Sequence, residues 1–179
     1  MDARRAVERA ARDSYGRLVA FLAARSRDVT AAEDALGDAF RAALEAWPQT
    51  GIPTRPEAWL LTAARRSLID RTRHAGVHDA ALPTLLAAAD EAEDAATGDT
   101  IFPDERLALL FVCAHPAIDA AARTPLMLQV VLGLDAARIA SAFLVQPGAM
   151  SRRLVRAKAK IRDAGVRFAL PDAGDLSDR

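Results

Sequence analysis

No stretch of this 179-residue chain carries the signal of a β-strand, and the chain reads as helices throughout. The clearest periodic segment follows Thr30, where the apolar residues are Ala35, Leu36, Ala39, Phe40, Ala43 and Leu44. Their spacing of three or four places one apolar stripe along a helix. Apolar residues make up 51% of the chain and aromatic residues only 5%, so it can bury real cores and favours helices. The predicted fold class is all-α.

Caps and prolines set the expected limits of the helices. Thr30, with Glu33 three residues later, predicts a capping box at the start of the second helix. Asp135 is predicted to cap the sixth, and prolines fit the first turns of several others. The first three expected helices run from Ala3 to Arg27, from Thr30 to Trp47–Pro48, and from Pro56 to Arg73. The fourth begins after Pro103, and the fifth runs from Thr124–Pro125 to Gly133. The sixth begins at Asp135 and the seventh runs from Pro147 to Asp163, and a further short helix is considered at 84–96.

Charge divides the chain into three stretches although its net charge is zero. Residues 1–73 carry 13 Lys/Arg and 10 Asp/Glu. Residues 74–105 carry no Lys/Arg and 8 Asp/Glu, and residues 106–179 carry 11 Lys/Arg and 6 Asp/Glu. A zero total argues weakly against a nucleic-acid binder. The pattern, however, is two mildly basic modules around an acidic segment that also contains Gly76, Pro83 and Gly98, which predicts a linker.

The last helix pair outlines a helix-turn-helix. A short capped helix, a turn with Gly148 and a basic helix follow one another between Asp135 and Asp163. On the second helix, Met150, Leu154, Ala157 and Ile161 fall within about 60° of one another. Arg152, Arg156 and Lys160 lie opposite, with Ser151 and Arg153 flanking, and six cations and no acid occur between 151 and 162. Arginine suits DNA because its fork bonds guanine or phosphate at two points. The alternative is a solvated basic face on an ordinary surface helix.

The helix expected from Pro56 to Arg73 carries a second candidate site. Trp59, Ala63, Arg66, Asp70 and Arg73 share one face, and Leu61, Ala64 and Leu68 lie roughly opposite, toward a core. An aromatic ring beside arginines is typical of single-strand binding, because bases stack on the ring while cations hold the backbone. A buried tryptophan next to surface arginines is an equally good interpretation.

These segments together resemble a known family. The strings AEDALGDAFRAALEAWP and PEAWLLTAARRSLIDRTR, followed by the helix-turn-helix, are similar to an extracytoplasmic-function sigma factor over about residues 10–73 and 103–165. Such factors carry two helical domains, which would be a sigma-2 domain at 1–75 and a sigma-4 domain at 103–168, with an acidic linker at 76–102 and a tail at 169–179. The resemblance implies a non-enzymatic initiation factor without cofactor or metal that binds core RNA polymerase and promoter DNA.

The resemblance also implies residue roles. The second helix would dock on the β′ clamp helices through Asp34, Leu36, Asp38, Phe40 and Arg41, and the polymerase β flap would be a further partner. The −10 element would be read and melted by the third helix and the loop Gln49–Arg55, with Arg66 seven residues after Trp59 at the position that reads an unpaired base. The residues assigned to this role are Arg55, Trp59, Arg65, Arg66, Asp70 and Arg73. Those assigned to the −35 duplex are Arg138, Ala149, Ser151, Arg152, Arg153, Arg156 and Lys160.

Some positions depart from the family pattern. Arg138 stands where Glu is common, which adds a phosphate contact or changes the −35 preference. The stretch FPDERLALLFVCAHPAI resembles a subgroup with a C-terminal helical-repeat extension, although Ala114 replaces one of its paired cysteines. That extension is missing after Pro171, so either a truncated form or a natural short variant is expected. Inhibition by an anti-sigma protein or by such an extension stays open.

The remaining chemistry is sparse. Cys113 is the single cysteine, which excludes an internal disulfide and fits a reducing cytosol. No secretion signal or apolar run of about 20 residues appears, so a cytoplasmic protein without a membrane contact is expected. A zinc site from His74, His78, Cys113 and His115 would need distant segments to meet. The rival functions are a stand-alone helix-turn-helix regulator and a helical adaptor without a DNA role.

Overall fold

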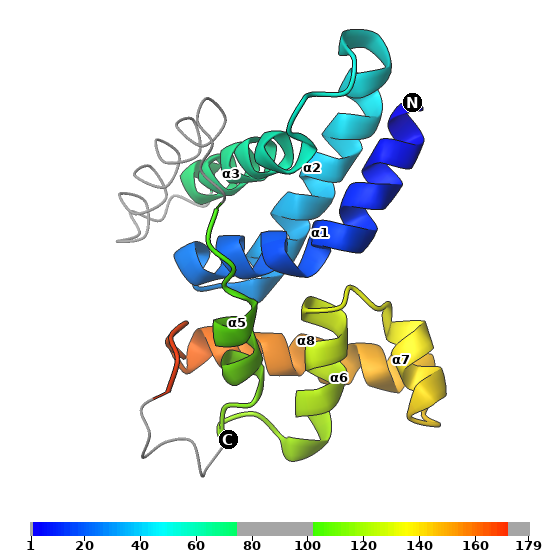
Figure 1. Ribbon diagram of the computed structural model, residues 1–179. Coiled ribbons are helices and arrows are strands. Elements are labelled where there is room, and N and C mark those ends of the chain that lie inside the picture. Colours follow the sequence, from blue (N-terminus) through cyan, green and yellow to red (C-terminus); the bar gives the residue numbers. More distant parts are fainter. Residues whose placement is uncertain (1, 75–101, 172–179) are drawn as a thin grey trace.

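The computed structural model describes residues 2–74 and 102–171, and every regular element among them is a helix. The predicted all-α fold class is confirmed. Figure 1 shows the arrangement. The elements are α1 (Ala3–Ser26), α2 (Val29–Thr50), α3 (Pro56–His74), α5 (Arg106–Cys113), α6 (Ala120–Val130), α7 (Ala136–Ala142) and α8 (Pro147–Asp163). The linker proposed at 76–102, the helix considered at 84–96, His78 and most of the tail fall outside the described residues.

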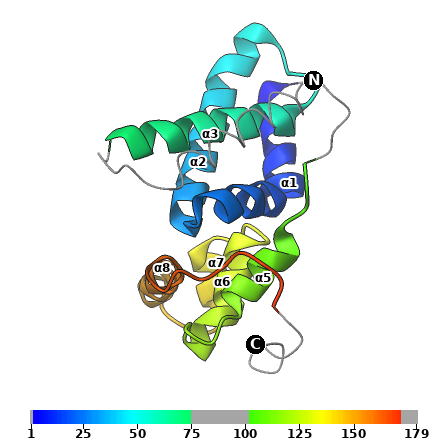
Figure 2. The ribbon, with the colours of Figure 1, turned by 90° about the vertical axis from the view of Figure 1, so that its left-hand side faces the viewer.

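Helices α1, α2 and α3 form what we call the N-terminal part. Helix α2 packs on both α1 and α3, and Figure 2 shows α3 crossing the other two. Its fully buried side chains come from all three helices and include Leu18, Leu22, Leu36, Trp47 and Leu60. Of the apolar stripe predicted on the second helix, Ala35, Leu36, Ala39 and Ala43 are buried, whereas Phe40 is half-buried and Leu44 is exposed.

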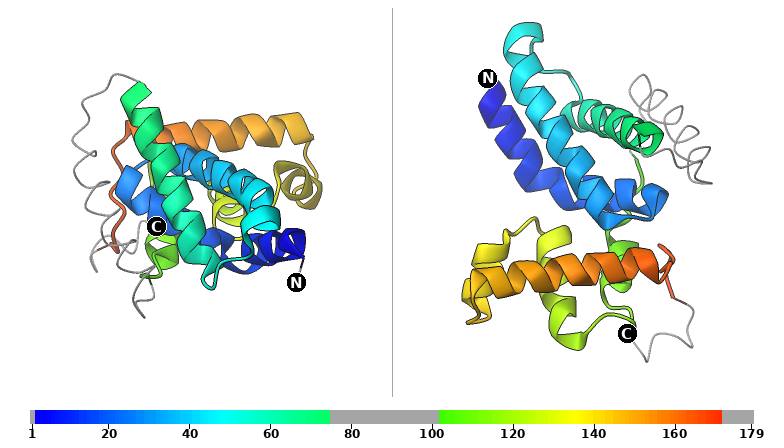
Figure 3. Two further views of the ribbon diagram at one scale, coloured as in Figure 1. Left: turned by 90° about the horizontal axis from the view of Figure 1, so that it is seen from above. Right: turned by 180° about the vertical axis from the view of Figure 1, so that it is seen from behind.

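Helices α5 to α8 form the C-terminal part. Helix α8 is the longest of them and packs on both α6 and α7, as Figure 3 shows from behind. Leu109, Leu126, Ile139, Met150 and Leu154 are fully buried between these helices. The short helix α7 and the long helix α8 are joined by a turn in which Leu144 takes a left-handed backbone, with φ of 54°.

The starts predicted for α7 and α8 are confirmed. The side chain of Asp135 accepts a hydrogen bond from the backbone N–H of Arg138 at 2.8 Å, which caps α7. Pro147 begins α8, where its missing N–H removes no helical hydrogen bond. Both signals lie within one turn of the helix start that they mark, so neighbouring helices do not alter them.

The start of α2 differs from the prediction. The cap is Asp28, whose carboxylate accepts from the N–H of Ala31 at 3.1 Å, and Thr30 lies inside the helix. The capping box of Thr30 and Glu33 was wrong because the Glu33 side chain has other partners. It accepts hydrogen bonds from the Tyr15 hydroxyl at 3.3 Å and the Lys158 ammonium at 2.6 Å.

The start of α6 is also earlier than predicted. Asp119 caps it by accepting from the N–H of Ala121 at 2.8 Å, so Pro125 lies within the helix rather than in its first turn. Proline cannot donate to the carbonyl four residues before it, here that of Ala121. Arg153 of α8 donates to this carbonyl at 3.4 Å, which supplies the missing partner.

The N- and C-terminal parts pack directly on each other. Helix α1 contacts α5 and α6, helix α2 contacts α8, and one cluster of buried apolar residues continues through both parts. Figure 1 shows α1 to α3 above α5 to α8. Within residues 2–74 and 102–171, no helix is long and apolar enough to cross a membrane.

Candidate polymerase and nucleic-acid interfaces

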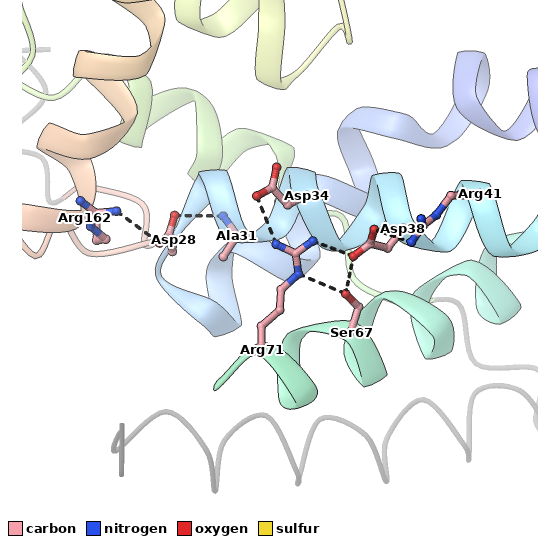
Figure 4. Close-up of polar contacts among 8 residues, drawn as sticks. All are labelled: Asp28, Ala31, Asp34, Asp38, Arg41, Ser67, Arg71 and Arg162. Atoms are coloured by element: carbon pink, nitrogen blue, oxygen red, sulfur yellow. Dashed lines mark hydrogen bonds and ion pairs between the residues drawn. The ribbon is translucent and has the colours of Figure 1, made fainter. Parts of the chain in front are cut away.

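The face of α2 that turns toward α3 carries a network of charged side chains (Figure 4). Arg71 of α3 reaches across to two carboxylates of α2, at 2.6 Å from Asp38 and 3.3 Å from Asp34. Ser67 donates to the same Asp38 oxygen at 2.8 Å, and Arg41 pairs with the other oxygen at 3.2 Å. The hydrogen bonds from Arg71 and then Ser67 lower the pKa of Asp38 below its usual range. The network therefore keeps this carboxylate ionised.

Of the five residues predicted to contact polymerase, the three charged ones belong to this network and reach solvent, whereas the two apolar ones are partly or fully buried. Asp34 and Arg41 are exposed, and Asp38 is partly exposed. Phe40 is half-buried against the core. Leu36 has no exposed surface, so the expectation that it forms part of a contact surface is wrong. It lies one turn after the buried Ala32 of α2, and its side chain packs between helices.

Helix α3 presents part of the predicted −10 face to solvent. Arg66 and Asp70 are exposed, one turn apart. Trp59 is half-buried, and its ring meets that of Trp47 edge to face with centroids 5.5 Å apart. It therefore belongs partly to the core, as the alternative interpretation held. Arg55, which directly precedes α3, is half-buried. The Arg73 side chain lies outside the described part of the structure. Of the loop expected at 49–55, the first two residues belong to α2.

The prediction that Arg65 belongs to the −10 surface is wrong, because its side chain is buried. It is 3% exposed, and its guanidinium lies over the ring of Phe21 in α1, 4.9 Å from the centroid. A cation over an aromatic ring gains from the negative face of the ring. The residue therefore lies between α3 and α1, whereas the adjacent Arg66 is exposed. Two adjacent arginines on a helix point about 100° apart, so only one can share the face of Trp59.

Helix α8 divides into the two faces that its sequence predicts. Met150, Leu154, Ala157 and Ile161 are buried, and Arg152, Arg156 and Lys160 are exposed. Ser151 is exposed and donates to the Pro147 carbonyl at 3.0 Å, while Ala149 is half-buried. Arg153 is half-buried and donates to the carbonyl of Ala121, so its role is at least partly structural. Arg138, on α7, is exposed and lies 3.4 Å from Asp135.

Lys158 was missed by the sequence reasoning. Its ammonium lies 2.6 Å from the Glu33 carboxylate of α2, and the two side chains are only 10% and 14% exposed. The helical wheel holds a signal that could have found it. Lys158 falls about 40° beyond Leu154 at the edge of the apolar face, where a charged residue needs a buried partner.

The other chemistry considered from sequence lies apart from these surfaces. Cys113 is fully buried, and burial, followed by the Glu33 carboxylate, raises the pKa of its thiol to about 12. The Nδ1 atom of His115 accepts from the N–H of Ala117 at 3.1 Å, which fits a local turn. Among the described residues, no group of three or more His, Cys, Asp or Glu side chains is arranged to hold a metal ion.

Comparisons with known proteins bear on the N-terminal part. Residues 11–77 match the family model described as Sigma-70 region 2, a stretch that takes in most of α1 and all of α2 and α3. An uncharacterized protein of Rhizobium meliloti (strain 1021) is 39% identical over 157 residues. The alignment covers 86% of this chain but only 37% of the relative's length. No solved structure matches the chain. The match shows that the part of the chain that forms α1 to α3 is similar to Sigma-70 region 2.

Proposed function

We propose that this chain binds core RNA polymerase and directs it to promoters, as a sigma factor of the extracytoplasmic-function group. The observation that carries the proposal is the match of residues 11–77 to Sigma-70 region 2, on three helices that expose charged side chains. We assign residues 1–75 to polymerase binding and the −10 element, 76–102 to a linker, and 103–168 to the −35 element.

The polymerase surface that we propose is the solvent-exposed edge of α2 that lies beside α3. Asp34, Asp38 and Arg41 supply charge, and the partly exposed Phe40 supplies apolar area beside them. Charges at the rim of an interface steer association, while an aromatic anchor supplies affinity. The hydrogen bonds from Arg71 and Ser67 fix the Asp38 carboxylate, so this part of the surface is ordered before any partner arrives.

The −10 surface that we propose is centred on Arg66. This exposed residue lies one turn from Asp70, and its neighbour Arg65 is buried against α1. A planar guanidinium can bond the edge of an unpaired base in two places, and the energy of that capture offsets part of the cost of unpairing. Arg66→Ala should therefore reduce open-complex yield more than duplex binding.

The −35 surface that we propose is the outer face of α8. Arg152, Arg156 and Lys160 are exposed along it, with Arg138 nearby in sequence on α7. If three of these cations meet phosphates, log affinity should fall with log salt at a slope of about −2.7. No salt dependence would favour the helical adaptor instead.

The experiment that tests the proposal compares single-alanine variants in two assays. Arg152→Ala and Arg156→Ala should weaken −35 duplex binding and leave capture by core polymerase intact. Exposed Arg167, beyond the end of α8, and exposed Arg12, on α1, offer matched Arg→Ala controls that should change neither assay. A wild-type chain that binds duplex DNA but not core polymerase would identify a stand-alone regulator and refute the proposal.

A further inference from the structure

Helix α7 ends at a left-handed residue that is not glycine. Leu144 has a φ of 54°, and its N–H donates to the Ser141 carbonyl at 3.2 Å. The N–H of Val145 donates to the Ala140 carbonyl at 3.0 Å, so the helix closes with a Schellman motif. Glycine is the usual residue at the left-handed position of this motif, because a Cβ atom is strained there. The chain therefore holds this leucine at a cost to stability.

Helix α8 ends in the same way and carries the usual residue. Val166 donates to the Ile161 carbonyl at 3.2 Å, and the left-handed residue is Gly165, with a φ of 58°. Within residues 2–74 and 102–171, Arg27 is the other non-glycine residue with a positive φ, and its side chain is charged. A large apolar residue at such a position needs an explanation beyond the closing of the helix.

Packing inside the chain does not supply that explanation. The Leu144 side chain is 94% exposed, and the preceding Phe143 is 39% exposed. The two form an apolar tip on the turn between α7 and α8. Backbone strain that no internal contact repays is typical of a residue that binds a partner. Leu144 is therefore a candidate contact with another molecule.

The charge around the turn favours DNA as that partner. From Ala136 to Arg162, the two helices and the turn contain seven Lys or Arg and no Asp or Glu. Arg138 precedes the turn and Arg152 follows it, and both are exposed. Phosphates are attracted to such a surface, and no acidic side chain of this segment repels them.

The position of the turn fits the same partner. In a helix-turn-helix, the first helix crosses the DNA backbone and the N-terminal residues of the second contact base edges in the major groove. Leu144 lies three residues before Pro147, the first residue of α8, which is at most about 11 Å of extended chain. A residue placed there lies between the DNA backbone and the base edges.

We propose that Leu144 extends the −35 contact beyond α8 by packing on the C5-methyl group of a thymine at the edge of that element. The inference rests on the proposed function, in which α8 reads duplex DNA. The thymine methyl is the apolar group that base pairs present in the major groove, so it is the group that an aliphatic side chain can select. The left-handed strain at Leu144 is then the cost of an added base contact.

Leu144→Gly separates stability from recognition. Glycine relieves the left-handed strain, so the thermal midpoint should rise by about 2–4 °C, whereas the preference for one thymine should be lost. Gly165→Leu is the matched control, because it makes the reverse exchange at the same position of the α8 motif. It should lower the midpoint by a similar amount and leave base preference unchanged.

The DNA probe is a duplex that the wild-type chain selects from a pool with a randomised core. Each thymine of the selected duplex is then replaced by deoxyuridine, which keeps the hydrogen bonds of the base pair and lacks the methyl group. The wild-type chain should lose about fourfold in affinity at one position, the loss expected for one buried methyl group. Leu144→Gly should lose less than about twofold at that position, because it has no side chain to bury the methyl group.

The outcomes separate the inference from the proposed function. Equal losses in the wild type and Leu144→Gly at every thymine, or a midpoint that does not rise in Leu144→Gly, would overturn the inference and leave the proposed function standing. Weaker capture of Leu144→Gly by core polymerase with unchanged DNA binding would assign Leu144 to polymerase and overturn the inference too. If the wild type enriches no sequence from the pool, the proposed −35 recognition fails, and the inference with it.

Discussion

Replacing Lys158 with Met should destabilise the protein strongly. The Lys158 and Glu33 side chains are 10% and 14% exposed and lie 2.6 Å apart, so the substitution leaves a carboxylate nearly buried without its cation. Removal of one partner from a buried ion pair costs about 3–5 kcal/mol. Because Tyr15 still donates to Glu33, we expect the lower end, a loss of about 3 kcal/mol in the free energy of unfolding.

The assay is urea denaturation at neutral pH, followed by circular dichroism. Lys160→Met is the matched control, because Lys160 is exposed two residues further along α8 and should change the free energy by less than about 0.5 kcal/mol. The double variant Glu33→Gln with Lys158→Met should recover most of the loss, since the new side-chain amide keeps an acceptor for Tyr15 and carries no charge. A loss below about 1 kcal/mol, or no recovery in the double variant, would refute the reasoning.

Three further changes test the packing and the polar contacts. Arg71→Ala should raise the pKa of Asp38 toward its ordinary range, as followed by nuclear magnetic resonance, because Arg71 is the main cause of its lowering. The sign is that of a lowered carboxyl pKa, so the stability that Asp38 contributes is present above about pH 4 and is lost as the pH falls through its folded value. Asp135→Ala should cost about 1 kcal/mol in thermal unfolding by removing the cap of α7, and Asp135→Asn should cost less. Leu126→Ala, at a fully buried position, should cost about 2–5 kcal/mol in denaturant unfolding, and a loss under about 1 kcal/mol would contradict its place in the core.

Local signals predicted the elements whose ends depend on nearby residues. Asp135 and Pro147 act within one turn of their own helix, so the sequence alone was sufficient for the starts of α7 and α8. The capping box predicted at Thr30 does not form, because Asp28 caps α2 and the Glu33 side chain pairs with Lys158, 125 residues away. The start of α6 was misplaced because Pro125 lies inside the helix. Its ring leaves the Ala121 carbonyl without a helical N–H partner, and Arg153 from another helix donates to that carbonyl instead.

The candidate site residues also divide into those that local signals placed correctly and those whose burial depends on other helices. The exposed faces of α3 and α8 come from helical periodicity, which correctly placed Arg66, Arg152 and Arg156 outside. Arg65 and Leu36 were misplaced because the resemblance assigned whole segments, whereas the partners that bury them, such as Phe21 for Arg65, lie on other helices. Helical periodicity already turned both residues away from the exposed faces, because Leu36 belongs to the apolar stripe and Arg65 lies about 120° from Trp59 around its helix. The partners on other helices could not be predicted from the pattern of one helix.

Run-off transcription tests the central claim most directly. Core RNA polymerase is supplied with this chain and a promoter taken from upstream of its own gene, and the same reaction is run with Arg66→Ala and Arg12→Ala. We expect a discrete transcript that requires the wild-type chain, falls with Arg66→Ala and persists with Arg12→Ala. If core polymerase gives the same transcripts with and without the chain, the claim that it is a sigma factor is contradicted.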